Sequence, residues 1–176
     1  MLSSPLNLDS ICATQYVDHF YYFFKRDFID SNTHLEQIYI NPRKDELEDG
    51  KQKVFWHLTT RTDSVWQQNG KQKVKVVERY PDLKRATRIC WIKEIIENYT
   101  DDHIKYFYSK HHTGKIRLYL WAYDHDFLVI LQKLGRSESI LVTSFYITHD
   151  GKRDELDEQY QEYKNGKSEL VNCEWF

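Results

Sequence analysis

Glycine, proline, methionine and cysteine are all scarce in this chain of 176 residues, which has 6 Gly, 3 Pro, 1 Met and 3 Cys. So few glycines exclude collagen and flexible linker proteins. The sequence also lacks a Gly-rich phosphate loop, a Gly-x-Ser-x-Gly elbow and a dinucleotide fingerprint. Enzymes that depend on a nucleotide cofactor are therefore disfavoured, and we expect no cofactor.

The cysteines and the apolar runs are equally restrictive. Cys12, Cys90 and Cys173 are odd in number and far apart, so they predict neither a disulfide framework nor a Cys-x-x-Cys metal site. The longest apolar runs, such as Phe127–Leu131, fall far short of the ~18 residues of a membrane span. Residues 1–9 lack the basic and apolar regions of a secretory signal. We therefore expect a reduced, cytoplasmic protein with no membrane partner.

What the chain does have is aromatic residues, 15% of the total, and an uneven charge. The net charge of −2 conceals a block of +8 in residues 51–93, between −5 in residues 1–50 and −4 in residues 150–176. The basic block favours a polyanionic partner. The acidic ends are interpreted either as solubilising surfaces or as segments, Arg43–Asp49 or the C-terminal tail, that fold over the basic surface and limit access to it.

Hydrophobic periodicity predicts an α+β fold, with helices covering an antiparallel sheet of about four to five strands. Residues 1–53 are predicted to form an N-terminal helical extension and a polar linker, residues 54–166 the main domain, and residues 167–176 a tail. The predicted helices are Cys12–Ile29, Pro81 to about Asn98, and Lys152–Lys164 with Gly166 as C-cap. The predicted strands are Val54–Arg61, Gln72–Val77 after a turn at Asn69-Gly70, Lys115–Tyr123, Phe127–Leu131 and Ile140–Thr148.

The segment Lys115–Tyr123 alternates strictly, and its second face carries Lys115, Arg117, Tyr119, Trp121 and Tyr123. Basic side chains contact phosphates and flat rings stack on unpaired bases, so this face is suited to RNA. The structural alternative is that Tyr119 and Trp121 pack under a helix.

A second basic feature is the segment from Arg79 to Arg88. On a helix, Arg85 and Arg88 are neighbours at i, i+3, and they can grip one or two phosphates while Asp82 holds the Arg85 guanidinium. Lys84 and Lys93 belong to the same block and extend the predicted RNA-binding surface. The alternative is a solvated basic helix face.

His57, in a predicted strand near these arginines, is a candidate general base, since its pKa suits proton transfer. A purely structural histidine is the alternative. His111, His112 and His125 suggest a metal, but no motif with metal-ligand spacing accompanies them, so we expect no metal site.

Five segments together resemble the Barnase–EndoU–Colicin–RelE-like (BECR) nuclease superfamily, in its phage and mobile-element branch. They are Phe55–Thr59, Pro81–Ile92, Lys115–Trp121, Phe127–Leu131 and Leu141–Tyr146, and the resemblance covers about residues 54–164. It implies a metal-independent ribonuclease with helices packed on a curved antiparallel sheet. It also implies catalytic roles for His57 as base, for Arg85, Arg88 and Arg117 on the phosphate, and for a hydroxyl from Thr143, Ser144 or Tyr146.

The sequence thus predicts a toxin or effector endoribonuclease of a phage or mobile element, which cleaves RNA by 2′-hydroxyl attack. A cognate inhibitor or immunity protein is a further expected partner. The alternatives are a non-catalytic RNA-binding module and a protein-interaction factor of a mobile element.

Overall fold

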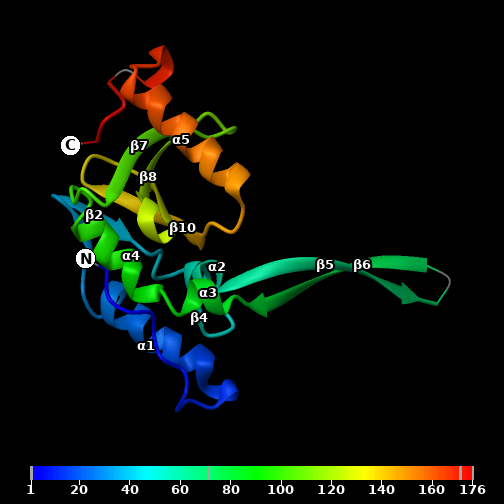
Figure 1. Cartoon of the computed structure of the whole chain (residues 1–176). Helices are drawn as coiled ribbons and strands as arrows, with labels where there is room; N and C mark the ends of the chain where they lie inside the picture. Colours follow the sequence, from blue (N-terminus) through cyan, green and yellow to red (C-terminus); the bar gives the residue numbers. More distant parts are fainter. Residues whose placement is uncertain (1, 71, 171, 176) are drawn as a thin grey trace.

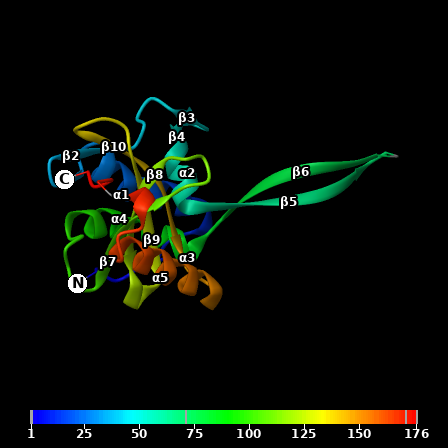
Figure 2. The ribbon, with the colours of Figure 1, turned by 90° about the horizontal axis from the view of Figure 1, so that it is seen from above.

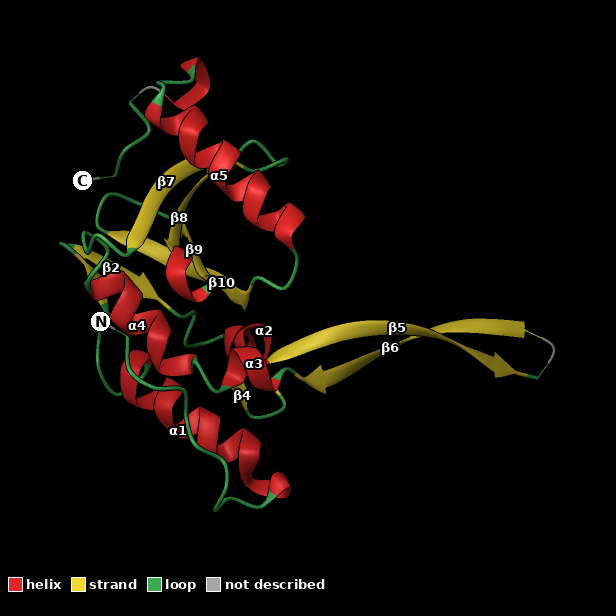
Figure 3. Ribbon diagram, viewed as in Figure 1, coloured by secondary structure: helices red, strands yellow, loops and turns green. Residues whose placement is uncertain are grey.

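The computed structural model describes residues 2–70, 72–170 and 172–175. Among these residues, six strands form one strongly curled sheet with the order β1-β2-β10-β9-β8-β7, and helices cover it (Figures 1 and 3). This confirms the predicted α+β class. The sheet is mixed, because β2 runs parallel to β10 while all the other neighbours are antiparallel.

The elements have the following bounds. The helices are α1 (Tyr16–Phe28), α2 (Lys53–Thr59), α3 (Leu83–Ala86), α4 (Ile89–Glu97) and α5 (Asp150–Lys164), with short 3₁₀ turns at Ala13–Gln15, Tyr123–His125 and Ser168–Leu170. The strands are β1 (His34–Leu35), β2 (Ile38–Asn41), β3 (Leu47–Glu48), β4 (Lys51–Gln52), β5 (Thr60–Asn69), β6 (Gln72–Pro81), β7 (Ile104–Lys110), β8 (Ile116–Ala122), β9 (Phe127–Lys133) and β10 (Glu138–Tyr146).

Both faces of the sheet are covered. Helices α1, α2 and α4 pack on one face around Phe24, Phe55 and Ile92, while α5 packs on the other through Leu156 (Figure 1). The central strand β9 is buried from Phe127 to Gln132, as a near-continuous apolar strand between two layers requires. The predicted strands β8, β9 and β10 and the predicted helix α5 are confirmed, and Gly166 adopts a positive φ at the end of α5.

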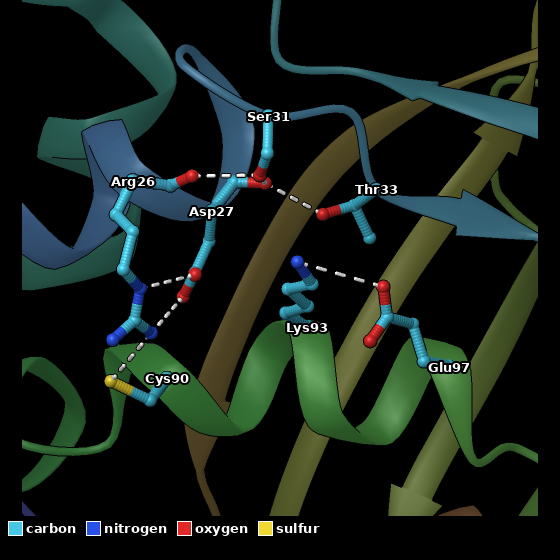
Figure 4. A network of polar contacts seen from close by, with 7 residues as sticks. All are labelled: Arg26, Asp27, Ser31, Thr33, Cys90, Lys93 and Glu97. Atoms are coloured by element: carbon cyan, nitrogen blue, oxygen red, sulfur yellow. Dashed lines mark hydrogen bonds and ion pairs between the residues drawn. The ribbon is translucent and has the colours of Figure 1, made fainter.

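The aromatic stripe of α1 enters the core at Phe20, Phe24 and Phe28, which lie one turn apart. A polar network then anchors the end of this helix (Figure 4). The buried carboxylate of Asp27 accepts two hydrogen bonds from Arg26, at 2.7 and 2.8 Å. The backbone carbonyl of Asp27 accepts a third from the Thr33 hydroxyl at 2.7 Å. Helix α1 is therefore tied to the start of β1, and it is part of the main body.

The segment predicted as a polar linker, residues 30–53, contains regular structure. Strand β2 hydrogen-bonds to β10 with Tyr39 opposite Glu138, so this segment supplies the sheet with its parallel strand. Its charged run then folds into the small hairpin of β3 and β4. The linker interpretation is therefore replaced by the edge strand β1, its neighbour β2 and a hairpin. The apolar anchors of β2, Ile38 and Ile40, are too few to show a clear periodicity in sequence.

Two further boundaries differ from the sequence predictions. Residues predicted to begin a strand at Val54 form helix α2, because Val54, Phe55 and Leu58 are buried together at helical spacing. The strand β5 starts only at Thr60. The single helix predicted from Pro81 is instead two helices: Pro81 ends β6, and Asp82 caps α3 by accepting a hydrogen bond from the backbone N–H of Arg85 at 3.2 Å.

The hairpin of β5 and β6 projects away from the body as a long two-stranded arm (Figure 2). The predicted turn at Asn69-Gly70 is confirmed, with Gly70 at a φ of +60°. At the other end of the chain, the backbone N–H of Trp175 donates to the hydroxyl of Tyr108, so Trp175 lies against β7, the last strand of the sheet. Within the described ranges, no helix is both long and apolar enough to cross a membrane.

Candidate functional site

A polar pocket of about 320 Å³ opens at one end of the sheet, where β8 begins and β9 ends. Helix α2 and the loop before β3 close it from the other side. Strand β10 contributes a β-bulge at this point, since Leu141 pairs with Leu131 while Thr143 already pairs with Ile130. Such bulges bend a strand and are common beside functional sites. The polar side chains that line the pocket are Arg43, Glu46, Lys53, His57, Lys115, Arg117 and Gln132.

Three of the residues predicted from sequence meet in this pocket: His57, Lys115 and Arg117. Arg117 donates a hydrogen bond from Nε to Oε1 of Gln132 at 3.4 Å, which orients its guanidinium. Lys115 stands two residues before Arg117, so the two side chains leave the chain in the same direction at the start of β8. The pocket therefore combines one imidazole with a cluster of cations.

Helix α2 explains the position of His57. Its buried face holds Val54, Phe55 and Leu58, and the opposite face presents His57 one turn after Lys53. Partial burial lowers the pKa of His57, the cations of Lys53, Arg79 and Arg85 lower it further, and Glu48 opposes them. The imidazole is therefore neutral at pH 7 and has a free lone pair, as a general base requires.

Arg85 of α3 contacts the C-terminal end of the same helix, α2. Its Nη1 donates to the backbone carbonyls of His57 at 2.8 Å and Thr60 at 3.0 Å, so it satisfies the C-terminal end of α2. Its Nε is buried without a hydrogen-bond acceptor among the described residues. Arg85 therefore supports the helix that carries His57 and does not itself line the pocket, where its predicted role on a phosphate would place it.

Arg88 and Tyr146 form a separate cluster at the other end of β10. The guanidinium of Arg88 lies 5.1 Å from the ring centre of Tyr146, and the ammonium of Lys84 lies 5.5 Å from it. Because α3 and α4 are separate helices, Arg85 and Arg88 diverge and do not form the predicted phosphate grip. Arg88, Lys84 and Tyr146 therefore lie outside the pocket.

Thr143 and Ser144, the other residues of β10 predicted to supply a hydroxyl, also lie outside the pocket. Thr143 follows the bulge, where its hydroxyl donates to the carbonyl of Ser144 at 3.4 Å. Ser144 is fully buried. Lys93 pairs with Glu97 on α4 at 3.7 Å (Figure 4). None of the three lines the pocket among the described residues.

The predicted stacking face of β8 is covered by α5. Trp121 is only 2% exposed, and Tyr119 stacks on Phe107 with ring centres 5.1 Å apart. The ammonium of Lys105 lies 5.1 Å from the ring of Tyr123, and it pairs with Asp157 of α5 at 2.7 Å. These rings belong to the second core, so the structural alternative is correct, and Tyr119, Trp121 and Tyr123 are not a platform for bases.

The remaining histidines do not extend the site. The Nδ1 of His103 lies 2.8 Å from Asp124 in a more apolar cavity of about 350 Å³, and His111 and His112 pack ring against ring. In the part of the chain that the structure describes, no group of three or more His, Cys, Asp or Glu side chains is arranged to hold a metal ion.

Sequence reasoning missed four pocket residues: Arg43, Glu46, Lys53 and Gln132. For Lys53, the sequence did contain a signal, because Lys53 and His57 are four residues apart and share one face of a helix. The others come from a loop and a strand end that only the fold brings together.

No protein family, curated protein or solved structure matches this chain. The resemblance to the BECR superfamily therefore stays a prediction, and the site is interpreted from its own chemistry.

Proposed function

We propose that this chain is a metal-independent endoribonuclease that cleaves RNA by attack of a ribose 2′-hydroxyl on the adjacent phosphate. The observation that carries the proposal is the meeting of His57, whose pKa is lowered, with Lys53, Lys115 and Arg117 in one pocket. A neutral base and a cluster of cations are the two requirements of this reaction, because the nucleophile loses a proton while negative charge grows on the phosphate.

The pocket supplies each step of the cleavage. His57 takes the proton from the 2′-hydroxyl, the 2′-oxygen bonds to phosphorus, and the bond to the 5′-oxygen breaks to leave a cyclic phosphate. Arg117 stabilises the charge on the phosphoryl oxygens, oriented by Gln132. Lys53 and Lys115 each carry an ammonium proton that can pass to the departing 5′-oxygen. Arg85 holds the end of α2, and therefore His57, in place.

RNA is the partner in this proposal, in a reducing, cytoplasmic setting that agrees with three free cysteines. For a toxin of a phage or mobile element, a cognate inhibitor would be a second partner, and an acidic surface over the pocket would complement its cations.

The test is cleavage of total RNA by the purified chain in the presence of a chelator, with mapping of the cut ends. We expect cleavage that leaves 2′,3′-cyclic phosphates, and a loss of about 10²–10⁴-fold in His57→Ala. His112→Ala is the matched control, since His112 is exposed and outside the pocket, and it should cleave as the wild type does.

Two results would contradict the proposal. Activity that disappears with the chelator would exclude the metal-independent mechanism. Salt-sensitive RNA binding without any cleavage would instead favour a non-catalytic RNA-binding module.

A further inference from the structure

The arm formed by β5 and β6 is the largest feature that the pocket does not explain. Each strand has ten residues, so the arm extends roughly 30 Å from the body (Figures 1 and 2). Apart from its first residue, β5 is exposed along its whole length. A two-stranded hairpin with solvent on both faces is marginal by itself, so an arm of this length points to a binding role.

Cross-strand register separates the charges of the arm onto two faces. On one face Trp66 lies opposite Lys75, Gln68 opposite Lys73, and Thr62 opposite Arg79. We call this the basic face, since it holds three cations and no carboxylate. The other face holds both acidic residues of the arm, Asp63 and Glu78, together with Arg61, Tyr80 and the valines Val65, Val74 and Val76.

The acidic groups are already paired within their own face. Asp63 pairs with Arg61 at 3.5 Å, and Glu78 accepts hydrogen bonds from Gln67 and Tyr80. On the basic face, by contrast, Lys73 and Lys75 have no carboxylate within ion-pair distance among the described residues. Trp66, directly opposite Lys75, is 65% exposed. The basic face thus presents free cations beside an exposed ring.

The basic face leads to the pocket. Arg79, at the base of the arm, lies with its guanidinium 5.3 Å from the ring centre of Trp56 on α2. Arg79 and Lys53 both contribute positive charge at His57. The cations therefore follow one another from Lys73 near the tip, through Lys75 and Arg79, to the pocket.

We infer that the basic face of the arm binds a single-stranded segment of RNA, with a base stacked on Trp66 and phosphates on Lys73 and Lys75. Single-stranded RNA is favoured because an exposed tryptophan needs an unpaired base, while alternating cations follow a phosphate backbone. A protein partner would instead use the opposite face with its valines. The inference rests on the proposed function only in that the same RNA strand continues into the His57 pocket.

The experiment compares the two faces by matched substitutions in a His57→Ala background, so that cleavage does not affect the binding measurement. Trp66→Ala and Lys75→Gln alter the basic face, while Tyr80→Ala and Arg61→Gln remove an aromatic ring and a cation from the opposite face. The probe is a fluorescently labelled single-stranded RNA of about 16 nucleotides, and the measurement is fluorescence anisotropy over a range of salt concentrations.

We expect Trp66→Ala to weaken binding by roughly 5- to 150-fold, the loss of one base–aromatic stack, and Trp66→Phe to restore most of it. Lys75→Gln should reduce the slope of log K against log salt by about 0.7, the value of one phosphate contact on a single strand. Tyr80→Ala and Arg61→Gln should bind as the parent does.

Equal affinity for all the variants would overturn the inference, as would equal losses on both faces. Self-association that Tyr80→Ala disrupts, with RNA binding unchanged throughout, would assign the arm to a protein partner. The two proposals fail separately. If Trp66→Ala loses RNA binding but the wild-type chain does not cleave RNA, the RNA-binding role of the arm stands and the proposed nuclease activity is refuted. If the wild-type chain cleaves RNA but Trp66→Ala binds RNA normally, only the role of the arm is refuted.

Discussion

At the scale of single residues, the pKa of the His57 imidazole depends on charged neighbours on four elements, one of which is Arg85 of α3. Lys53 precedes it by one turn on α2, Arg79 reaches it from the base of the arm, and Glu48 of β3 opposes both. Burial and the cations dominate, so the pKa of His57 lies below its ordinary value. In the proposed reaction only the neutral imidazole accepts a proton, and activity must therefore fall as pH decreases through that lowered pKa.

The pH dependence of cleavage tests this arrangement. We expect kcat/KM of the wild-type chain to rise with pH along a limb whose pKa is below 6.5, the ordinary value for histidine. Lys53→Gln removes a cation that disfavours protonation, so it should move this limb to higher pH. Lys152→Gln, on the distant helix α5, is the control and should leave the limb in place. An unmoved limb in Lys53→Gln would show that His57 is not the titrating base.

Residue chemistry alone selected His57, Lys115 and Arg117 as candidates, because an imidazole and cations favour phosphate chemistry in any fold, and the structure places all three in one pocket. It did not predict the position of Arg85, since nothing in the sequence shows that its guanidinium turns back to the carbonyls at the end of α2. Where a long side chain points depends on which backbone groups lack partners, and the tertiary structure determines that.

At the scale of elements, the small hairpin of β3 and β4 lies against the base of the arm. Glu48 forms an ion pair with Arg79, Asp49 lies 4.0 Å from the same guanidinium, and Glu46 lines the pocket. Of the two interpretations of the acidic N-terminal block, this contact favours the one in which Arg43–Asp49 folds over the basic surface. In the C-terminal tail, Trp175 packs against β7 instead.

Neutralising this hairpin should strengthen RNA binding. We expect Glu48→Gln to raise the affinity for single-stranded RNA by about 2- to 5-fold at low salt, since it frees Arg79 from an ion pair of ~0.5–1 kcal/mol. The gain should disappear at high salt, where such charges are screened. Fluorescence anisotropy at both salt concentrations is the measurement. Glu158→Gln, which makes the same charge change on α5, is the control. An equal gain in RNA affinity there would show that the effect comes from net charge and not from the contact with Arg79.

The effect of the acidic hairpin on RNA binding is better tested by point substitution than by deletion of the acidic block, residues 1–50. That deletion would also remove α1, β1 and β2. These elements bury Phe24, Phe28 and Ile40, so the truncated chain would lose part of its core. An effect on RNA binding could then not be separated from unfolding.

At the scale of the whole molecule, one sheet separates two hydrophobic cores. The larger core lies under α1, α2 and α4, and the smaller one lies under α5 with Trp121 at its centre. Both cores use side chains from β8 and β9, because successive residues of a strand point to opposite faces. Loss of packing on one face therefore weakens the strands of the other.

Removal of the Trp121 side chain measures this coupling. We expect Trp121→Ala to lower the free energy of unfolding by about 3–5 kcal/mol and to leave one cooperative transition, because the two cores share strands. Urea unfolding followed by circular dichroism and by fluorescence is the measurement. Trp66→Ala, at the exposed tryptophan of the arm, should change stability by no more than about 0.5 kcal/mol. Two separate transitions would show that the cores unfold independently.

The covering of the β8 aromatic face was predictable in principle. The run Phe127–Leu131 is apolar at every position, and such a strand needs a layer on each side. A neighbouring strand in the same sheet must then also be covered twice. Helix α2 was harder to predict from the sequence, because seven residues rich in β-branched and aromatic side chains suit a strand as well as a helix.

The sequence by itself determined the α+β class, the strands β8 to β10, the helices α1 and α5, and the basic character of residues 51–93. These follow from periodicity and charge, which are local properties of the chain. Only the tertiary structure decided which cations share a pocket with His57, which aromatic rings are buried, and that the acidic hairpin lies on Arg79. Those contacts join residues far apart in the chain, and they depend on how the curled sheet brings its strand ends together with α2.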